Sequence, residues 1–438
     1  MSEYILPNDD FQRENIAINI AKIILSDNDV SPMLINGDWG TGKTVLAHRI
    51  QKKISKNESD VRCIYINAFQ EDHVDNALIT LVSAVAKTLP NKEKVNLLEK
   101  AKPAIRFGLS TIAKGVVSHV LRTDSDSLAE EYTDMLKEMS GKTIDYAIDN
   151  MLEDHIKSEE SIEGLKSMLK ALSEKNKIII IIDELDRCNP YFAIDLVEKI
   201  KYVFDMDGIK FILLANSSQL EASIKNRYGG LKHGAQYLEK FIKYTIDLPI
   251  FFLENGNDRE VSSHHFDKLI PEIINIYDST QRKIIIEIKE LIISNSISLR
   301  EVENYIRNIK IYQLLSDREL KKDLPIILLY KLTFIFIYTF SQKFEISLRG
   351  IKENSSIIYK IKGLELDKNN KKPQLNQLIC HAITNYRWDD FDGQYESYND
   401  SKDDEILKEI HRMSPNEMRG SPNYKAQLLS VFSTLSFI

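Results

Sequence analysis

The chain has 438 residues, of which 28% are charged and 43% hydrophobic, proportions typical of a soluble globular protein with two or three domains. The formal net charge is −7, from 58 basic and 65 acidic residues. This balance excludes a protein whose whole surface binds nucleic acid, although a local basic groove is compatible with it. The first ten residues carry no signal-peptide pattern, so we expect a cytoplasmic protein. Three cysteines, Cys63, Cys188 and Cys380, lie far apart without metal-binding spacing, which predicts free thiols.

A helix is predicted between residues 8 and 27, where isoleucines and alanines recur at helical spacing. Asp9 or Asp10 is the candidate cap for its first turn. Such a helix before the first strand would cover the sheet or flank a nucleotide base, and we expect its role to be structural.

The next stretch joins an apolar strand, 33–36, to the sequence GDWGTGKT at 37–44. This is the G-x-x-x-x-G-K-T pattern of phosphate-binding loops, and the apolar spacing of residues 45–54 predicts the helix that should follow it. The glycines let the backbone approach phosphate, Lys43 brings a positive charge to the outer phosphates, and Thr44 offers a hydroxyl ligand to Mg²⁺. The residues that we expect to contact the nucleotide are Gly37, Asp38, Trp39, Gly40, Thr41, Gly42, Lys43, Thr44 and Val45.

A second strand is predicted at residues 61–67, which are rich in β-branched and aromatic side chains. It is followed by Glu71 and Asp72, and the carboxyl end of a parallel strand is where open α/β sheets hold ligands. Two interpretations stay open for these carboxylates. In the first, Glu71 or Asp72 orients a water molecule or faces a partner. In the second, one of the two residues caps a helix predicted over residues 74–89.

An acidic motif ends the third strand, in the sequence KIIIIIDELD at 177–186. Five consecutive isoleucines predict a strand that is buried on both faces, as in a parallel sheet. Asp183 is the candidate to hold Mg²⁺ through water, and Glu184 the candidate general base that polarises the attacking water. Arg187 either pairs with Asp186 or reaches a phosphate bound to a neighbouring subunit.

Two more strands are predicted, a buried one at residues 210–215 and a final one at 244–248. Asn216 follows the first of them, where its amide can act as a sensor of the γ-phosphate or attacking water; a turn-forming asparagine is the alternative. Strands that alternate with helices in this way predict an α/β fold. We expect a parallel sheet of at least five strands with helices on both faces.

Two apolar stretches raise the question of membrane insertion. Residues 104–121 are interrupted by charged side chains, and we expect an amphipathic surface or partner helix there. Residues 324–340 are the most apolar part of the chain, and we predict a buried helix of a C-terminal bundle, with membrane insertion as the alternative.

Several of these features together resemble the KAP family of P-loop NTPases. They are the sequence GDWGTGKT, the strand end INAF, the run IIIIIDELDRCNP, the stretch YLEKFI at 237–242, and SLRE at 298–301. The resemblance covers roughly residues 8–345. It implies an ATPase core with an extra strand between the two phosphate motifs, followed by a helical lid. It also implies ATP and Mg²⁺ as ligands, and the absence of a guanine-recognition motif near the last strands favours ATP over GTP.

The resemblance implies further roles and a domain plan. Arg300 corresponds to a lid arginine that touches the γ-phosphate; a surface ion pair is the alternative. Arg227 and Lys240 lie where related ATPases place a trans-acting positive charge, and the alternative is that each is an ordinary surface residue. The expected plan is an NTPase core at 1–250 with a helical insertion at about 90–173, a lid at 251–345 and a partner-binding region at 346–438. Bacterial members resemble components of mobile elements, and some exclude phages.

The predicted function is a cytoplasmic, Mg²⁺-dependent ATPase that acts as a nucleotide-driven switch in anti-phage defence. We expect it to work as a homo-oligomer, with a separately encoded effector protein, or with both. The alternatives are a nucleotide-gated scaffold with little turnover and a motor that nucleic acid stimulates, which the acidic charge disfavours.

Overall fold

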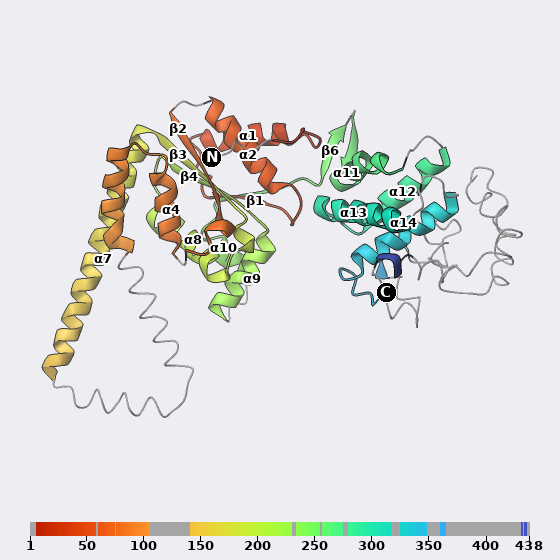
Figure 1. Ribbon diagram of the computed structural model, residues 1–438. Coiled ribbons are helices and arrows are strands. Elements are labelled where there is room, and N and C mark those ends of the chain that lie inside the picture. Colours follow the sequence, from red (N-terminus) through yellow and green to blue (C-terminus); the bar gives the residue numbers. More distant parts are fainter. Residues whose placement is uncertain are drawn as a thin grey trace, which may run out of the picture. The chain divides into compact units, whose positions relative to one another are not determined.

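A computed structural model describes the chain at residues 6–57, 60–74, 76–105, 141–229, 234–254, 256–274, 279–316, 320, 325–347, 360–364, 431 and 433–435. Clustering of contacts divides the chain into two compact units (Figure 1). The first comprises 1–38 and 42–248, and the second comprises 39–41 and 249–438. Each unit is described by itself below.

The first unit is built on a five-stranded sheet in which every pair of neighbours is parallel. The strands are β1 (Met33–Asn36), β2 (Val61–Asn67), β3 (Lys177–Asp183), β4 (Ile209–Ala215) and β5 (Tyr244–Asp247). Their order across the sheet is β2-β3-β4-β1-β5, so β4 lies between the two strands that carry the phosphate motifs. The five predicted strands are confirmed to within one residue at each end. The extra strand that the family resemblance implied is in place as well.

The isoleucine run of β3 is buried on both faces, as its sequence predicts. Ile178, Ile180 and Ile182 point into one hydrophobic cluster, while Ile179 and Ile181 point into another. Side chains alternate between the faces of a strand, so each face of the sheet needs its own helical cover. The sequence therefore specifies a three-layer unit with two cores.

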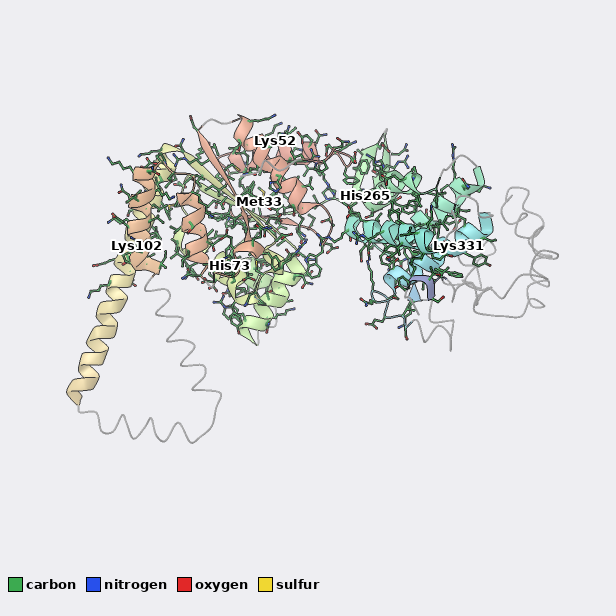
Figure 2. The ribbon with its side chains drawn as sticks, in the orientation of Figure 1. Met33, Lys52, His73, Lys102, His265 and Lys331 are labelled. Atoms are coloured by element: carbon green, nitrogen blue, oxygen red, sulfur yellow. The ribbon has the colours of Figure 1, made fainter. Side chains whose placement is uncertain are left out.

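Helices cover both faces of this sheet (Figure 1). On one face lie α1 (Arg13–Leu25) and α2 (Lys43–Asn57), which pack on β1, β3 and β4. On the other lie α4 (Ala77–Ala86), α7 (Gly141–Lys175), α8 (Pro190–Val203), α9 (Ser217–Tyr228) and α10 (Gly234–Leu238), with residues 91–105 also helical. Two short elements, α3 (Ala68–Glu71) and the 3₁₀ turn η1 (Leu185–Arg187), follow β2 and β3. Figure 2 shows Met33 inside this unit and Lys52 and Lys102 at its periphery.

Helix caps in this unit confirm one prediction and exclude one alternative. Gln12 is at the N-cap position of α1 and makes no side-chain cap hydrogen bond. Asp9, three residues earlier, accepts hydrogen bonds from the backbone N–H groups of the first two residues of α1, at 2.8 and 3.0 Å, and so satisfies the helix end as predicted. Of the two interpretations left open for Glu71 and Asp72, the cap of the helix at 74–89 is excluded. That helix, α4, is capped by Asn76, whose side chain accepts from two backbone N–H groups. Glu71 instead pairs with Lys87, and Asp72 accepts the backbone N–H of Asn189 at 2.8 Å.

Cys63 and Cys188 are free thiols, as the spacing of the cysteines predicts, whereas Cys380 lies outside the described residues. Burial raises the pKa of the Cys63 thiol to about 12 and also raises that of Cys188. At neutral pH both side chains therefore stay protonated, and they pack as small apolar groups.

The second unit begins with an antiparallel hairpin, β6 (Phe251–Glu254) and β7 (Asn257–Glu260), that we had not predicted. Its signal in the sequence is the Asn-Gly pair at 255–256, a dipeptide typical of tight hairpin turns, and Gly256 has a φ of +79°. The helices that follow are α11 (Val261–Leu269), the 3₁₀ turn η2 (Ile270–Glu272), α12 (Ser279–Ser294), α13 (Leu299–Leu315) and α14 (Pro325–Phe340).

The most apolar stretch of the chain forms α14, which is a buried helix as predicted. Residues from Leu328 to Ile337 include eight buried apolar side chains that pack against α11, α12 and α13 in one cluster. Within the part of the chain that the structure describes, no helix is long and apolar enough to span a membrane. The other candidate, 104–121, falls outside the described residues except for its first two positions.

Loss of the capping box of α13 provides a stability test of the second unit. The Ser298 hydroxyl accepts the Glu301 backbone N–H, and the Glu301 carboxylate accepts the Ser298 backbone N–H at 2.8 Å. Ser298→Ala is expected to lower the free energy of unfolding by about 1 kcal/mol, measured by denaturant unfolding followed by circular dichroism. Ser298→Thr, which keeps the hydroxyl, is the control. Equal stability of the two variants would contradict the assignment.

Candidate functional site

The loop between β1 and α2 has the backbone that its glycines predict. Gly40 and Gly42 have φ values of +79° and +87°, a region that disfavours residues with a side chain. Helix α2 begins at Lys43, and Val45 lies in its first turn. The free N–H groups at the start of this 15-residue helix provide an anion-binding end next to the carboxyl edge of the sheet.

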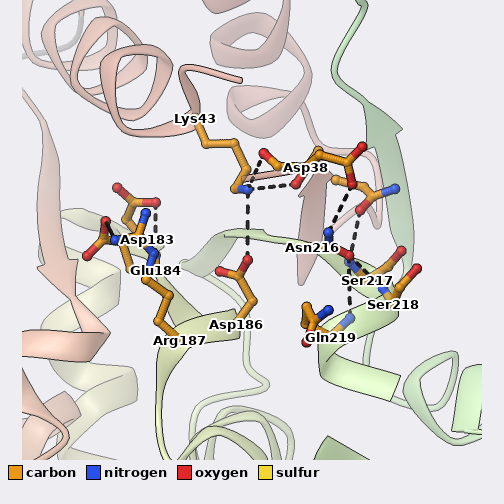
Figure 3. Close-up of polar contacts among 12 residues, drawn as sticks. Asp38, Lys43, Asp183, Glu184, Asp186, Arg187, Asn216, Ser217, Ser218 and Gln219 are labelled. Atoms are coloured by element: carbon orange, nitrogen blue, oxygen red, sulfur yellow. Dashed lines mark hydrogen bonds and ion pairs between the residues drawn. The ribbon is translucent and has the colours of Figure 1, made fainter. Parts of the chain in front are cut away.

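Lys43 folds back onto its own loop (Figure 3). Its Nζ donates to the carbonyl oxygens of Gly37 at 2.6 Å and Asp38 at 3.1 Å, and it lies 3.9 Å from an Asp186 carboxylate oxygen. Burial lowers the pKa of the Lys43 ammonium, while the charges of Asp186 and Asp183 act in the opposite direction. The Asp186 side chain is only 1% exposed, so this pair lies in a region of low dielectric constant. A phosphate that binds here must compete with Asp186 for the ammonium.

Asp183 lies at the tip of β3 and is completely buried. Its carboxylate accepts hydrogen bonds from the backbone N–H of Glu184 at 2.9 Å, from the Tyr65 hydroxyl at 3.0 Å and from the Thr44 side chain. Burial raises the pKa of the Asp183 carboxyl, and the Thr44 and Tyr65 hydrogen bonds oppose that rise. The loop residue and the strand residue that we predicted as Mg²⁺ ligands are thus in direct contact.

The residues present suit a magnesium ion. Thr44 and Asp183 offer hard oxygen donors, and the buried carboxylate gains from a neighbouring cation. Among the described residues there is no group of three or more His, Cys, Asp or Glu side chains placed to hold a metal. Mg²⁺ in nucleotide enzymes typically uses one or two protein oxygens and completes its shell with phosphate and water, so two donors are sufficient.

Glu184 has a left-handed backbone, with φ 59°, and its carboxylate is held at both oxygens. One oxygen forms an ion pair with Arg187 at 3.0 Å, and the other accepts from the Asn67 side-chain amide at 3.2 Å. The opposite end of that amide accepts the backbone N–H of Gln70 at 3.1 Å, which fixes its orientation. This role of Asn67 was not predicted from the sequence. Its signal is the position at the end of β2, directly opposite Asp183 in the sheet.

The Asn216 side chain caps a helix and also contacts the phosphate loop. Its side-chain oxygen caps α9 by accepting the N–H groups of Ser218 and Gln219 at 3.0 and 3.4 Å. Its amide nitrogen donates to the Asp38 carboxylate of the phosphate loop at 3.0 Å (Figure 3). The side chain therefore connects β4 to the loop, while a sensor role stays a prediction.

Two of the candidate trans-acting residues, Arg227 and Lys240, contact side chains or backbone of their own unit. Arg227 donates to the Tyr191 carbonyl at 2.9 Å and lies 3.6 Å from the Glu198 carboxylate. The Lys240 ammonium lies 5.2 Å from the centre of the Tyr237 ring. Arg300 is in the first turn of α13 in the second unit. No observation tests its predicted contact with the γ-phosphate.

Comparison with family models agrees with this geometry. The model of the KAP family P-loop domain matches residues 13–316, which is more than half of the chain. The chain belongs to the KAP family. The KAP domain suggests that the protein binds and hydrolyses a nucleoside triphosphate. A search of curated proteins found no match to the chain.

The pair between Lys43 and Asp186 leads to a binding prediction. Asp186→Asn removes a buried negative charge that competes with phosphate for the ammonium, so nucleotide should bind about tenfold more tightly, or ~1.4 kcal/mol. Fluorescence titration with a labelled ADP measures the dissociation constant. Asp205→Asn is the matched control, because it makes the same charge change in an ion pair with Lys201 at 2.8 Å, outside the phosphate loop. Unchanged or weaker binding by Asp186→Asn would contradict the competition.

Proposed function

We propose that the protein is a Mg²⁺-dependent ATPase that works as a nucleotide-driven switch. The observation that supports this most directly is the hydrogen bond between Thr44, at the start of α2, and Asp183, at the tip of β3. It brings the phosphate loop and the acidic strand end to one place, as a single bound triphosphate with its metal ion requires.

In this proposal the chain holds the triphosphate from two sides. The loop N–H groups and Lys43 bind the phosphates. To do so, Lys43 breaks its hydrogen bonds with the carbonyl oxygens of Gly37 and Asp38. Thr44 and Asp183 would hold Mg²⁺, which supplies charge neutralisation at the phosphate oxygens when bound. Asp186 then loses its ammonium partner, so nucleotide binding carries an electrostatic signal to the turn that follows β3.

Glu184 is the proposed general base, and its contacts suggest how its activity is controlled. A carboxylate that accepts from Asn67 and pairs with Arg187 is not free to orient water. Hydrolysis therefore requires at least one of these contacts to open. This opening couples catalysis to movement of the end of β2 and of η1, which is the property of a switch.

Two substitutions separate binding from hydrolysis. Lys43→Ala should abolish nucleotide binding, because the anion loses its point charge. Glu184→Gln should bind ATP normally and lose turnover by a factor of about 10²–10⁴, the usual contribution of a general base. Phosphate release and labelled-nucleotide binding are the two measurements. Lys52→Ala, which removes an exposed lysine from the same helix, is the control for Lys43.

The same pair of measurements distinguishes the alternative functions. Equal and negligible turnover in the wild type and in Glu184→Gln, with normal binding, would contradict the ATPase and favour a nucleotide-gated scaffold. Strong stimulation of turnover by DNA or RNA would favour a motor. A preference for GTP in the same binding assay would contradict the choice of ATP.

The biological setting that we propose is anti-phage defence in the bacterial cytoplasm, through a homo-oligomer, a separately encoded effector protein or both. The support is the resemblance of the motifs to bacterial members of the family. A phage challenge of cells that carry the wild type or Lys43→Ala at equal protein levels tests it. We expect fewer plaques with the wild type, and equal plaque counts would contradict the defence role.

A further inference from the structure

We infer that Tyr65 is a positioning residue that holds Asp183 in the orientation needed to take Mg²⁺. This inference rests on the proposed nucleotide function and adds a residue to it. Tyr65 belongs to strand β2 and lies outside the metal-binding pattern of the phosphate motifs.

The position of Tyr65 follows from the register of the sheet. Strand β2 pairs with β3 in parallel, with Tyr65 opposite Ile181 and Asn67 opposite Asp183. Residues two apart on a strand face the same way, so Tyr65 and Asn67 lie on one face of β2 at its carboxyl end. The Tyr65 hydroxyl reaches the Asp183 carboxylate at 3.0 Å, while Asn67 reaches Glu184. One strand thus contacts both carboxylates of the acidic motif.

The Tyr65 ring is itself fixed by a residue of the phosphate-loop helix. The ring of His48, on α2, lies 4.3 Å from the Tyr65 ring, centroid to centroid, at an interplanar angle of 33°. Helix α2 begins with Lys43 and Thr44, so the helix that carries the loop lysine also packs against the tyrosine. Aromatic contacts of this kind restrict ring position, and the hydroxyl direction follows from the ring.

The hydroxyl matters because Asp183 is completely buried, so its orientation depends on the protein groups around it. Its Oδ1 accepts the Glu184 backbone N–H and its Oδ2 accepts the Tyr65 hydroxyl, which fixes both oxygens of a completely buried carboxylate. A hydrogen bond to a charged acceptor is stronger than one between neutral groups, and its loss leaves an uncompensated lone pair. Without it, only the Glu184 N–H and the Thr44 side chain hold the carboxylate, so its orientation is less restricted and the metal loses part of a pre-oriented ligand.

The test is Tyr65→Phe, which removes one oxygen atom and keeps the ring against His48. The measurement is the affinity for fluorescently labelled ADP with Mg²⁺ and with EDTA. In the wild type, Mg²⁺ should strengthen binding. The Mg²⁺-dependent gain is the ratio of the affinity with Mg²⁺ to the affinity with EDTA. In Tyr65→Phe we expect this gain to be about tenfold smaller than in the wild type, with unchanged affinity in EDTA. Tyr202→Phe, at a tyrosine of α8 that is 66% exposed, is the matched control.

A second variant tests the support of the ring. His48→Leu removes the aromatic contact and leaves the hydroxyl in place, so its Mg²⁺-dependent gain should lie between those of the wild type and Tyr65→Phe. Thermal unfolding of each variant, followed by circular dichroism, confirms that the fold is kept. A catalytic assay is not needed for either variant.

Three outcomes would overturn the inference, and they are distinguishable. A wild type that binds no nucleotide contradicts the proposed function, and the role of Tyr65 with it. A wild type with a Mg²⁺-dependent gain that Tyr65→Phe keeps in full contradicts only the role of Tyr65. An equal loss of affinity in Mg²⁺ and EDTA indicates that Tyr65 supports the nucleotide site generally, which also contradicts a positioning role toward the metal.

Discussion

The site depends on the compensation of two buried charges, the Lys43 ammonium and the Asp183 carboxylate. A buried charge is costly unless polar groups or an opposite charge surround it. In the structure the chain supplies those groups from within. Carbonyl oxygens of the loop and Asp186 face Lys43, while two hydroxyls and an N–H face Asp183. A triphosphate would offer the Lys43 ammonium a stronger partner, and Mg²⁺ would do the same for the Asp183 carboxylate. The site is therefore suited to replace these internal contacts with contacts to a bound ligand.

The fold places these charges together through strand order. Strand β4 separates β1 from β3 in the sheet, so the loop after β1 and the tip of β3 lie on either side of the end of β4. Asn216, at the end of β4, fills part of this edge by bonding to Asp38. Strand β2, on the other side of β3, contacts Asp183 and Glu184 through Tyr65 and Asn67. The carboxyl ends of four neighbouring strands thus contribute to one polar network.

Features with a local physical cause could be predicted from the sequence. The isoleucine run of β3 predicts a strand buried on both faces, and the glycines of the loop predict positive φ angles, because neither depends on distant residues. Tyr65, by contrast, lies 118 residues from Asp183 in the chain, and its contact depends on the register between β2 and β3. The cap of α4 could not be decided from the sequence, because several polar side chains precede that helix and tertiary contacts decide which of them faces it. The hairpin of the second unit was missed although its Asn-Gly pair is a recognisable signal.

The most direct test of this account is a crystal structure of the protein with Mg²⁺ and a non-hydrolysable ATP analogue. The account predicts that the Lys43 ammonium moves from the Gly37 carbonyl and Asp186 to the phosphate oxygens, with Mg²⁺ between Thr44 and Asp183. A nucleotide bound elsewhere, or a phosphate loop in which Lys43 keeps its contacts with Gly37 and Asp186, would contradict it.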